Sequence, residues 1–386
     1  MAEREELDDY LGSFLDLNVS PARVIQKEGA LGEIEECLMS VGDNFILICE
    51  KKIFEKTLPY FKNLNCVKED KIIFTESACC CYKETDRIYS AIEKIGGCDA
   101  IIAAGGGTVM DIAKIAAYNS RKPLITVPTS AATCAAFTSL AVVYSAEGVF
   151  SHYDYLNKNP DICVIEPAMI MNAGSRLLAA GFADSAAKYV EGVWSYSGKA
   201  RDYYSELGLM VAYNLTNEIL SIGARAIEDV NNNTMSREVF EAVSYNIIAS
   251  GLSSGIAGMK IYPNIAHSIS NGVTALFNAE SYLDIFHGES ISLGLGVGAL
   301  LMPDEGDKIK AIVAALKSFG LPVSLSGLLG LSRNAKNIDA RDAAGIIAKK
   351  AMAENESIHD ISFITEDILY KALIETDKSP HLTINY

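Results

Sequence analysis

The most informative segment of the chain for its fold is AIIAAGGGTVMDIAK, residues 100–114. It opens with a short apolar run typical of a buried strand and closes with the spacing of a helix. Gly105, Gly106 and Gly107 join the two parts. Glycine lets the backbone come close to a phosphate, and the helix that follows offers free N–H groups and the positive end of its dipole. The segment therefore indicates a dinucleotide-binding turn, although it lacks the GxGxxG fingerprint and a tight turn without a ligand stays the alternative.

Short apolar runs alternate with helical patterns on both sides of this segment. The strand candidates are residues 45–49, 72–74, 100–103, 124–127, 141–144 and 162–165, and the helical patterns lie at 30–40, 52–62, 85–95 and 110–118. Strands that alternate with helices at this spacing are typical of a doubly wound, mostly parallel sheet with helices on both faces. We therefore predict an N-terminal α/β domain over residues 1–168.

The pattern changes after Glu166 and Pro167, where the chain becomes rich in Ala, Leu, Ile and Ser at helical spacing. The predicted helices cover residues 176–197, 201–222, 235–255, 265–276, 291–301, 307–319, 339–353 and 364–376. We see no strand pattern there. The prediction is an all-α C-terminal domain over residues 169–386.

Composition excludes several classes of partner. The chain has 386 residues with 33 Lys and Arg against 49 Asp and Glu, a net charge of −16, which repels nucleic-acid phosphates and anionic lipid headgroups. No apolar run is long enough to span a membrane. Nine scattered cysteines and a polar, acidic start to the sequence favour a reducing, cytoplasmic location. The run Cys79, Cys80 and Cys81 lacks a second ligand pair at zinc spacing, so we interpret it as structural.

Two further features favour a nucleotide ligand. Glu50 follows the strand candidate at 45–49, where a carboxylate can accept hydrogen bonds from a ribose diol and repels a 2′-phosphate. That favours NAD over NADP, although a surface glutamate beside Lys51 and Lys52 is the alternative. The segment 128–140 is rich in small and hydroxyl residues that could contact a flat ligand, or could simply form a tight crossover.

The helical half contains a candidate metal site. Of only five histidines, His267 and His287 lie 20 residues apart in apolar surroundings, and Asp184 lies in another apolar stretch. Two imidazoles and one carboxylate leave coordination positions open, as in catalytic zinc and non-haem iron sites. The alternative is that each group is a satisfied core residue.

Six segments in this order resemble the glycerol dehydrogenase branch of the iron-containing (group III) alcohol dehydrogenases, which are related in fold to dehydroquinate synthase. They are residues 105–114, 129–140, 158–161, 181–184, 266–272 and 287–289. The resemblance implies an NAD-dependent oxidoreductase with a cleft between two domains, one divalent zinc or iron ion, a small-molecule substrate and a homo-oligomeric assembly.

The resemblance also implies roles for individual residues. The metal-binding, catalytic residues would be Asp184, His267 and His287. The NAD contacts would be Gly105, Gly106, Gly107 and Asp111 at the pyrophosphate and nicotinamide, Thr129, Thr138, Leu140 and Tyr144 along the rest of the cofactor, and Glu50 at the adenosine ribose, with Lys158 near the cofactor.

The chain departs from that branch at three positions. Cys134 stands where an aspartate usually contacts polyol hydroxyls, and the loop 132–136 resembles those of relatives that act on 2-oxo and 2-hydroxy acids. We therefore expect the substrate to be a small polar alcohol, polyol or 2-hydroxy acid, with glycerol less favoured. Ser270 replaces a frequent histidine, and Thr108 replaces a frequent lysine.

Two alternatives to a dehydrogenase stay open. A carbocycle-forming lyase of the dehydroquinate synthase type would use NAD and a metal but needs basic residues for a phosphorylated substrate, for which Lys188 and Lys260 are the main candidates. A non-catalytic sensor of NAD or metal is the other.

Overall fold

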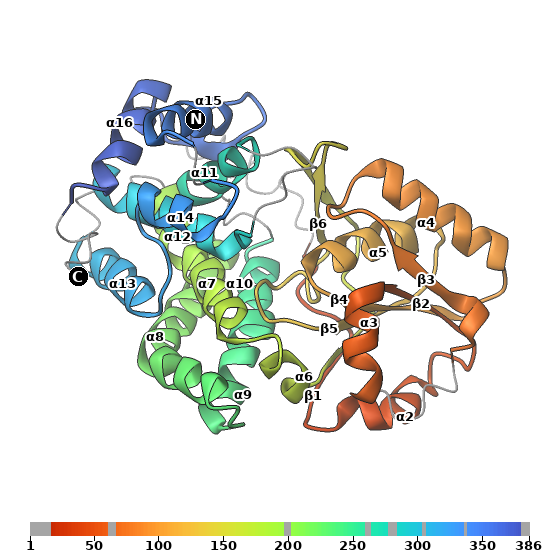
Figure 1. Cartoon of the computed structure of the whole chain (residues 1–386). Coiled ribbons are helices and arrows are strands. Elements are labelled where there is room, and N and C mark those ends of the chain that lie inside the picture. The colour runs from red at the N-terminus through yellow and green to blue at the C-terminus, as the bar shows by residue number, and fades with distance from the viewer. Residues whose placement is uncertain are drawn as a thin grey trace, which may run out of the picture.

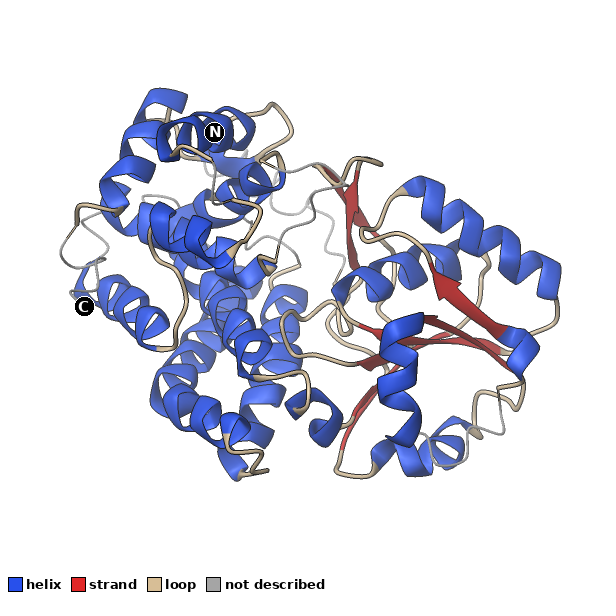
Figure 2. Ribbon diagram, in the orientation of Figure 1, coloured by secondary structure: helices blue, strands red, loops and turns tan. Residues whose placement is uncertain are grey.

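The computed structural model describes residues 17–60, 67–196, 202–258, 264–276, 284–302, 306–335 and 338–379. A six-stranded sheet lies in one half of the molecule and a group of helices fills the other half (Figures 1 and 2). The sheet contains β1 (Arg23–Gln26), β2 (Phe45–Glu50), β3 (Ile72–Thr75), β4 (Ala100–Gly105), β5 (Leu124–Pro128) and β8 (Ile162–Ile165), in the order β1-β8-β5-β4-β2-β3. Every neighbouring pair is parallel, which confirms the predicted parallel sheet.

Side chains that alternate along the strands build two separate cores, one on each face of the sheet. Leu47 and Cys49 of β2 face one core, with η1 (Ala30–Glu33) and α2 (Ile34–Leu38). Ile46 and Ile48 face the other, with α4 (Tyr82–Ile95) and α5 (Gly107–Asn119). The remaining elements of this half are α3 (Lys51–Thr57), η2 (Leu58–Tyr60), η3 (Glu69–Lys71) and α6 (Pro167–Met171). Helices therefore cover both faces, and the doubly wound prediction is confirmed.

The assignment of residues 141–144 to the parallel sheet is wrong. This run forms β6 (Leu140–Tyr144), which pairs antiparallel with β7 (Phe150–Tyr155) in a separate two-stranded sheet. The connection between the two strands is a short turn, in which the N–H of Ser145 donates to the carbonyl oxygen of Val149 at 2.8 Å. A parallel pairing needs a long crossover connection, so a turn of this length permits only a hairpin.

The other half is helical, as predicted, and the described residues after Ile165 contain no strand. Its elements are α7 (Ser175–Ser195), α8 (Tyr203–Asn231), α9 (Arg237–Ser244), η4 (Tyr245–Ala249), α10 (Ser250–Ile256), α11 (Ile265–Thr274), α12 (His287–Leu301), α13 (Gly306–Ser318), α14 (Leu325–Leu331), α15 (Ala340–Ala351), η6 (Ser357–Asp360) and α16 (Glu366–Thr376). The sequence patterns did not predict the strands β1 and β7 or the helices α6 and α14, which are all short or only partly apolar.

The proposed division at residue 168 lies where the last strand ends and the helices begin. Contacts nevertheless cross it, because the hairpin β6–β7 lies against the helical half. The N–H of Phe150 donates to Thr274 Oγ1 at 3.1 Å, and Asn271 Nδ2 donates to the Tyr153 hydroxyl at 3.2 Å. We keep two domains as a proposal, with the hairpin as the bridge between them.

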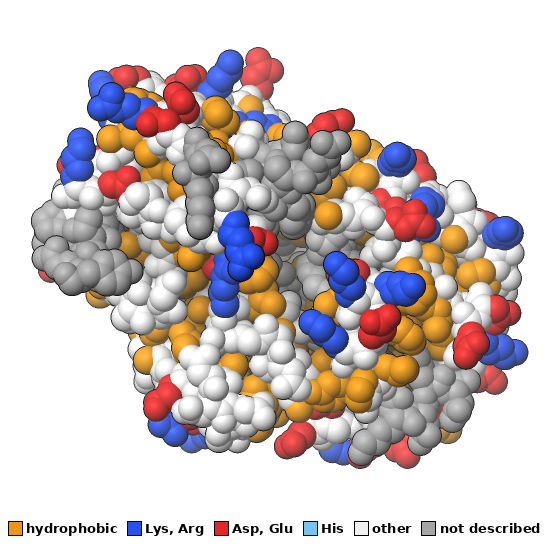
Figure 3. Space-filling model, in the orientation of Figure 1, with side chains coloured by type: hydrophobic (Ala, Val, Ile, Leu, Met, Phe, Trp, Pro, Cys, Tyr) orange, Lys and Arg blue, Asp and Glu red, His pale blue; other side chains and the backbone are white. Residues whose placement is uncertain are grey.

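No helix within the described ranges has both the length and the apolar character needed to cross a lipid bilayer. On the face shown in Figure 3, acidic and basic side chains are interspersed over both halves, with hydrophobic side chains between them. The charge on this face is therefore not concentrated in either half.

A close backbone approach joins the two halves at Gly181 of α7. A Cβ at this position would overlap the carbonyl oxygen of Ala131, in the loop after β5, and the side-chain amide of Asn246. The amide nitrogen of Asn246 also donates to Ala131 at 2.9 Å and to Leu178 at 3.0 Å. The loop after β5 is thereby fixed against α7, one turn before Asp184.

This contact makes Gly181→Ala a test of the packing. The added methyl group has no free space, and overpacking of this kind costs about 1–3 kcal/mol. We expect Gly181→Ala to lower the free energy of unfolding in urea by that amount. Gly345 of α15 has no heavy atom near its ideal Cβ, so Gly345→Ala should raise the same free energy by about 0.5–1 kcal/mol. Similar changes in the free energy of unfolding of the two variants would contradict the close packing at Gly181.

Candidate metal centre and nucleotide-binding surface

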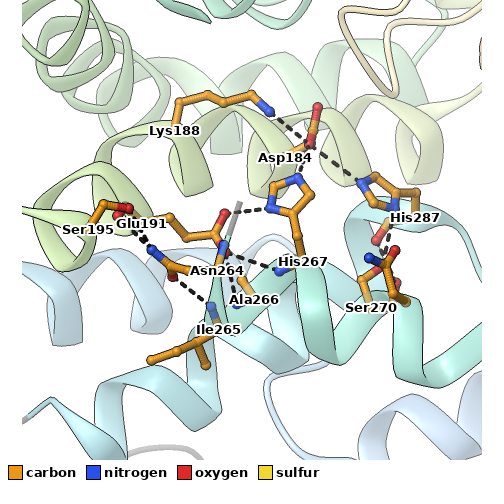
Figure 4. Close-up of polar contacts among 12 residues, drawn as sticks. Asp184, Lys188, Glu191, Ser195, Asn264, Ile265, Ala266, His267, Ser270 and His287 are labelled. Atoms are coloured by element: carbon orange, nitrogen blue, oxygen red, sulfur yellow. Dashed lines mark hydrogen bonds and ion pairs between the residues drawn. The ribbon is translucent and has the colours of Figure 1, made fainter. Parts of the chain in front are cut away.

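Three side chains from three helices of the helical half converge on one another (Figure 4). Asp184 comes from α7, His267 from α11 and His287 from the first position of α12. The Nε2 atoms of His267 and His287 lie 3.5 and 3.7 Å from Asp184 Oδ1. One ligand atom from each residue lies within 4.8 Å of the other two. The structure therefore brings together the three residues predicted to bind a metal.

Tight helix packing explains why these helices meet here. A Cβ on Gly288, next to His287, would overlap the carbonyl of Ala180 in α7. Further along α12, a Cβ on Gly294 would lie 2.5 Å from the Cα atom of Ala266, next to His267. Glycine at both positions lets the backbones approach closely, and each contact lies one residue from a predicted ligand.

Glu191 holds the first imidazole. One carboxylate oxygen of Glu191 contacts Nδ1 of His267. The other accepts hydrogen bonds from the backbone N–H groups of Asn264, Ala266 and His267 at 2.8, 2.9 and 3.1 Å. Glu191 therefore satisfies N–H groups at the start of α11, which otherwise lack partners, and leaves Nε2 of His267 facing Asp184.

Ser270 holds the second imidazole. Its hydroxyl lies 3.1 Å from Nδ1 of His287 and 2.6 Å from the hydroxyl of Ser290. With Nδ1 occupied in this way, Nε2 of His287 also faces Asp184. Ser270, which stands where the family resemblance implies a frequent histidine, therefore contacts the predicted metal ligand His287 directly.

The charge on Asp184 is stabilised despite its burial. Burial by itself raises the pKa of this carboxyl, but Lys188 and hydrogen bonds from both imidazoles outweigh that effect and hold the pKa well below its ordinary value. Lys188 Nζ lies 3.6 Å from Asp184 Oδ1. Burial lowers the pKa of Lys188, but the carboxylate of Asp184 more than compensates and raises it overall.

The donor set fits a divalent metal ion. It offers one carboxylate and two Nε2 atoms, and each Nδ1 is held by a polar partner, the usual arrangement around histidine ligands. Three protein ligands leave positions for water or substrate, as in catalytic zinc sites and in iron sites with two histidines and a carboxylate.

Cys134 lies beside this centre. Its side chain is buried, and burial raises the pKa of the thiol while the charges of Lys188 and Asp184 act on it in opposite directions. A thiol with a raised pKa is neutral at neutral pH. The predicted substrate contact therefore presents a neutral group within electrostatic range of Lys188 and Asp184.

The glycines lie at a position where open α/β sheets bind ligands. In the sheet, β3 lies on one side of β2, and β4 and then β5 follow on its other side. The strand order therefore reverses its direction between β2 and β4. Ligands bind at the carboxyl ends of the strands at such a switch. Glu50 ends β2 and is exposed, and Gly105 ends β4. The structure thus brings the predicted ribose and pyrophosphate contacts to the same edge.

The loop after β5 lies beside the glycines. The N–H of Thr129 donates to the carbonyl of Gly105 at 2.9 Å. Thr138 is buried further along the loop, and Leu140 and Tyr144 are the first and last residues of β6. These four predicted cofactor contacts therefore lie along one continuous segment from the sheet edge into the hairpin.

Asp111, a predicted cofactor contact, has partners within the protein. Its buried carboxylate accepts the N–H of Val142 at 3.2 Å and pairs with Lys114 at 2.8 Å. Burial raises the pKa of Asp111, and Lys114 partly offsets the shift. The ammonium of Lys114 also contacts the carbonyl of Leu140. In this structure, Asp111 and Lys114 join α5 to β6.

Lys158 lies away from the glycines. It pairs with Asp161 at 3.0 Å, and Asp161 Oδ2 accepts the N–H of Leu124 at the start of β5 at 2.8 Å. Lys158 therefore sits at the amino-terminal edge of the sheet, opposite the edge that carries Gly105.

The three consecutive cysteines are buried and support the hairpin. The carbonyl of Cys80 accepts the N–H of Tyr144 at 2.8 Å, and Cys79 Sγ lies 3.7 Å from the carbonyl of Ser145. These contacts agree with the structural interpretation of the run.

The sequence patterns predicted no role for Glu191 and no link between Lys188 and the metal ligands. In α7, Lys188 follows Asp184 by four residues and Glu191 follows it by seven. Residues at this spacing share one face of a helix. The spacing was visible in the sequence, but the partner helix that carries His267 was not.

Comparisons with known proteins bear on the family and the fold of the chain. A family model described as iron-containing alcohol dehydrogenase matches residues 21–167. Glycerol dehydrogenase from Thermotoga maritima is 30% identical over 89% of this chain and 91% of its own length. Hydroxycarboxylate dehydrogenase A from Escherichia coli is 29% identical over 75% of this chain and 78% of its own. The structure of sulfoacetaldehyde reductase from Bifidobacterium kashiwanohense, in complex with NAD+, superposes with a TM-score of 0.71 at 17% identity, covering 94% and 98% of the two chains.

The geometry predicts that His267→Ala loses bound divalent metal and keeps its helical content. The variant removes one of three ligand atoms and leaves the other packing groups in place. Elemental analysis and circular dichroism of the purified protein measure both properties. His359→Ala is the matched control, because His359 is exposed and lies in η6, outside the cluster. Normal metal content in His267→Ala would contradict the assignment.

The contact between Glu191 and His267 gives a second prediction. Glu191→Gln keeps an oxygen for the N–H groups of α11 but removes the charge that faces Nδ1. Loss of such a supporting contact typically weakens metal binding by about 10- to 100-fold. Competition with a chromogenic chelator measures the affinity. Glu356→Gln changes another buried carboxylate, which accepts a hydrogen bond from Asn271 at 3.0 Å, and should bind metal normally. Equal affinities in the two variants would refute the role of Glu191.

Proposed function

The chain belongs to the iron-containing alcohol dehydrogenase family, and on that premise we propose that it transfers hydride between NAD(H) and a small polar alcohol, polyol or 2-hydroxy acid. It is an alcohol dehydrogenase-like oxidoreductase, as its relatives are. The observation that carries the proposal is the convergence of Asp184, His267 and His287 on one point. Cofactor, metal and substrate class are the parts that we propose.

In this proposal, Asp184, His267 and His287 hold one zinc or iron ion. Such an ion acts as a Lewis acid that lowers the pKa of a bound hydroxyl group. Glu191 and Ser270 keep the two imidazoles oriented through their Nδ1 atoms. Their contribution is to fix the ligands before the substrate arrives, so that less reorganisation accompanies the reaction.

The α/β half binds the cofactor in this proposal. Gly106 precedes α5 and Gly107 begins it. N–H groups without intrahelical partners and the helix dipole favour a pyrophosphate at this end of the helix. The carboxylate of Glu50 accepts hydrogen bonds from the adenosine ribose, which favours NAD over NADP. Thr129, Thr138, Leu140 and Tyr144 then line the path toward the helical half, and Asp111 acts by holding β6.

The substrate binds between the loop after β5 and the metal centre. Ala131 of that loop contacts Asn246, and Gly181 lies against it one turn before Asp184. In the oxidative direction the carbinol carbon gives a hydride to NAD+, the carbonyl product forms, and the hydroxyl proton leaves to solvent. The residues contribute positioning and exclusion of water, which are large effects when the reacting atoms are held close.

The proposed compartment is the reducing cytoplasm, which suits the seven described cysteines that are buried and free. A homo-oligomeric assembly also stays a prediction, as does the use of a small-molecule substrate without nucleic-acid or membrane partners.

Chelation tests the proposal. We expect protein stripped of metal to lose at least about 100-fold of its NADH-forming rate, because the Lewis acid contributes several kcal/mol to such reactions. Added zinc or ferrous iron should restore the rate in the wild type but not in His267→Ala. The assay follows NADH absorbance with glycerol and 1,2-propanediol, and NADH consumption with 2-oxobutyrate. Full activity without metal would contradict the proposal, and turnover without net change in NADH would favour the lyase alternative.

A further inference from the structure

A buried ammonium group lies at the metal centre. Lys188 follows Asp184 by one helical turn in α7, and its side chain is only 15% exposed. Its Nζ lies 3.6 Å from Asp184 Oδ1, and Figure 4 shows it directed toward that carboxylate. Both histidine Nε2 atoms face the same oxygen. Lys188 is thus a third polar partner of Asp184, beside the two imidazoles.

Lys188 shares its nearest carboxylate, that of Asp184, with the two imidazoles. The other carboxylate that acts on it is that of Glu191, which is engaged with Nδ1 of His267 and with backbone N–H groups at the start of α11. A divalent ion at the cluster would be balanced by the carboxylates of Asp184 and Glu191. The ion, the two carboxylates and Lys188 would then sum to a charge of +1, which favours an anionic ligand.

A divalent ion would also push the ammonium away from Asp184. Both cations would be held at the carboxylate of Asp184, and like charges repel strongly in a buried environment. The flexible lysine stem lets the ammonium turn away from Asp184 toward a bound anion. Cys134, whose side chain is buried, lies within electrostatic range of this ammonium.

We propose that Lys188 is the substrate-binding residue that selects anionic substrates, and that the substrate is a small 2-hydroxy acid or its 2-oxo counterpart. The carboxylate of the substrate binds the Lys188 ammonium while its hydroxyl faces the cluster of Asp184, His267 and His287. This inference rests on the proposed function and narrows its substrate class.

The short distance between Lys188 and the cluster sets the size of this substrate. The ammonium and the cluster share Asp184 Oδ1, so the two groups that they bind must lie close together. In a 2-hydroxy acid the hydroxyl and carboxylate are on adjacent carbons, which suits this spacing. Oxidation moves a hydride from C2 to NAD+ and releases the hydroxyl proton, and the carboxylate is unchanged.

Two pairs of matched substrates isolate the effect of the substrate carboxylate on kcat/KM. Lactate and 1,2-propanediol differ in a carboxylate against a hydroxymethyl group, and glycerate and glycerol form a second pair. We expect the wild-type holoenzyme to have the higher kcat/KM with the acid of each pair. A hydrogen bond to a charged group contributes enough to change affinity by about 10- to 100-fold.

We therefore expect Lys188→Gln to lower kcat/KM for the acids by about 10- to 100-fold and for the diols by less than about 3-fold. Lys188→Arg keeps the charge and should retain the preference for acids. Cys134→Asp places a carboxylate beside Lys188 and should also abolish the preference, with Lys188 still present. Metal content is measured in every variant, so that loss of the ion is distinguished from loss of substrate binding.

Binding without turnover gives an independent readout. Calorimetry with the NADH-bound holoenzyme compares oxamate, an anionic analogue of a 2-oxo acid, with oxamide, its neutral counterpart. Lys188→Gln should weaken the binding of oxamate by the same factor by which it lowers kcat/KM for the acids. It should leave the affinity for oxamide unchanged.

Three results would overturn the inference. They are a wild-type preference for the diols, an equal loss on acids and diols in Lys188→Gln, and oxamate binding that does not depend on Lys188. Absence of turnover with all four substrates, in protein with a full metal content, would overturn the proposed function and this inference with it.

Discussion

The close approach of α12 to α7 is the constraint on which the rest of the site depends. Gly288 lies so near the carbonyl of Ala180 that any side chain would collide with it. This approach places His287, the preceding residue, opposite Asp184. Gly294 brings α11 against the same helix, and His267 completes the cluster. The three polar groups meet because backbone packing around them leaves little freedom, so a small change in helix spacing would separate them.

The sheet and the helices make different contributions to one site. The parallel sheet supplies an edge where Glu50 and the glycines from 105 to 107 lie at a switch in strand order. The helical half supplies side chains that are held by Glu191 and Ser270. The loop that contains Ala131 joins them, because it follows β5 and is fixed to α7 through Asn246. In the proposed enzyme, this loop sets how the cofactor faces the metal ligands.

Much of the fold was predictable because its elements carry strong local patterns. Buried parallel strands such as β2 and β4 are continuous apolar runs, and the helices of the second half repeat apolar residues at regular spacing. The run at 141–144 was assigned to the wrong sheet because an apolar run does not reveal its pairing partner. The ligands Asp184, His267 and His287 stood out as polar groups in apolar segments. Glu191 did not, since its role depends on the start of another helix.

If Asp184, His267 and His287 bind one cation, anomalous X-ray scattering from crystals grown with zinc and NADH will locate it. We expect a single zinc peak at about 2.0–2.2 Å from Nε2 of His267, Nε2 of His287 and a carboxylate oxygen of Asp184, with the nicotinamide ring facing it. A zinc peak elsewhere, or side chains that turn away from one another in a fully loaded crystal, would contradict this expectation.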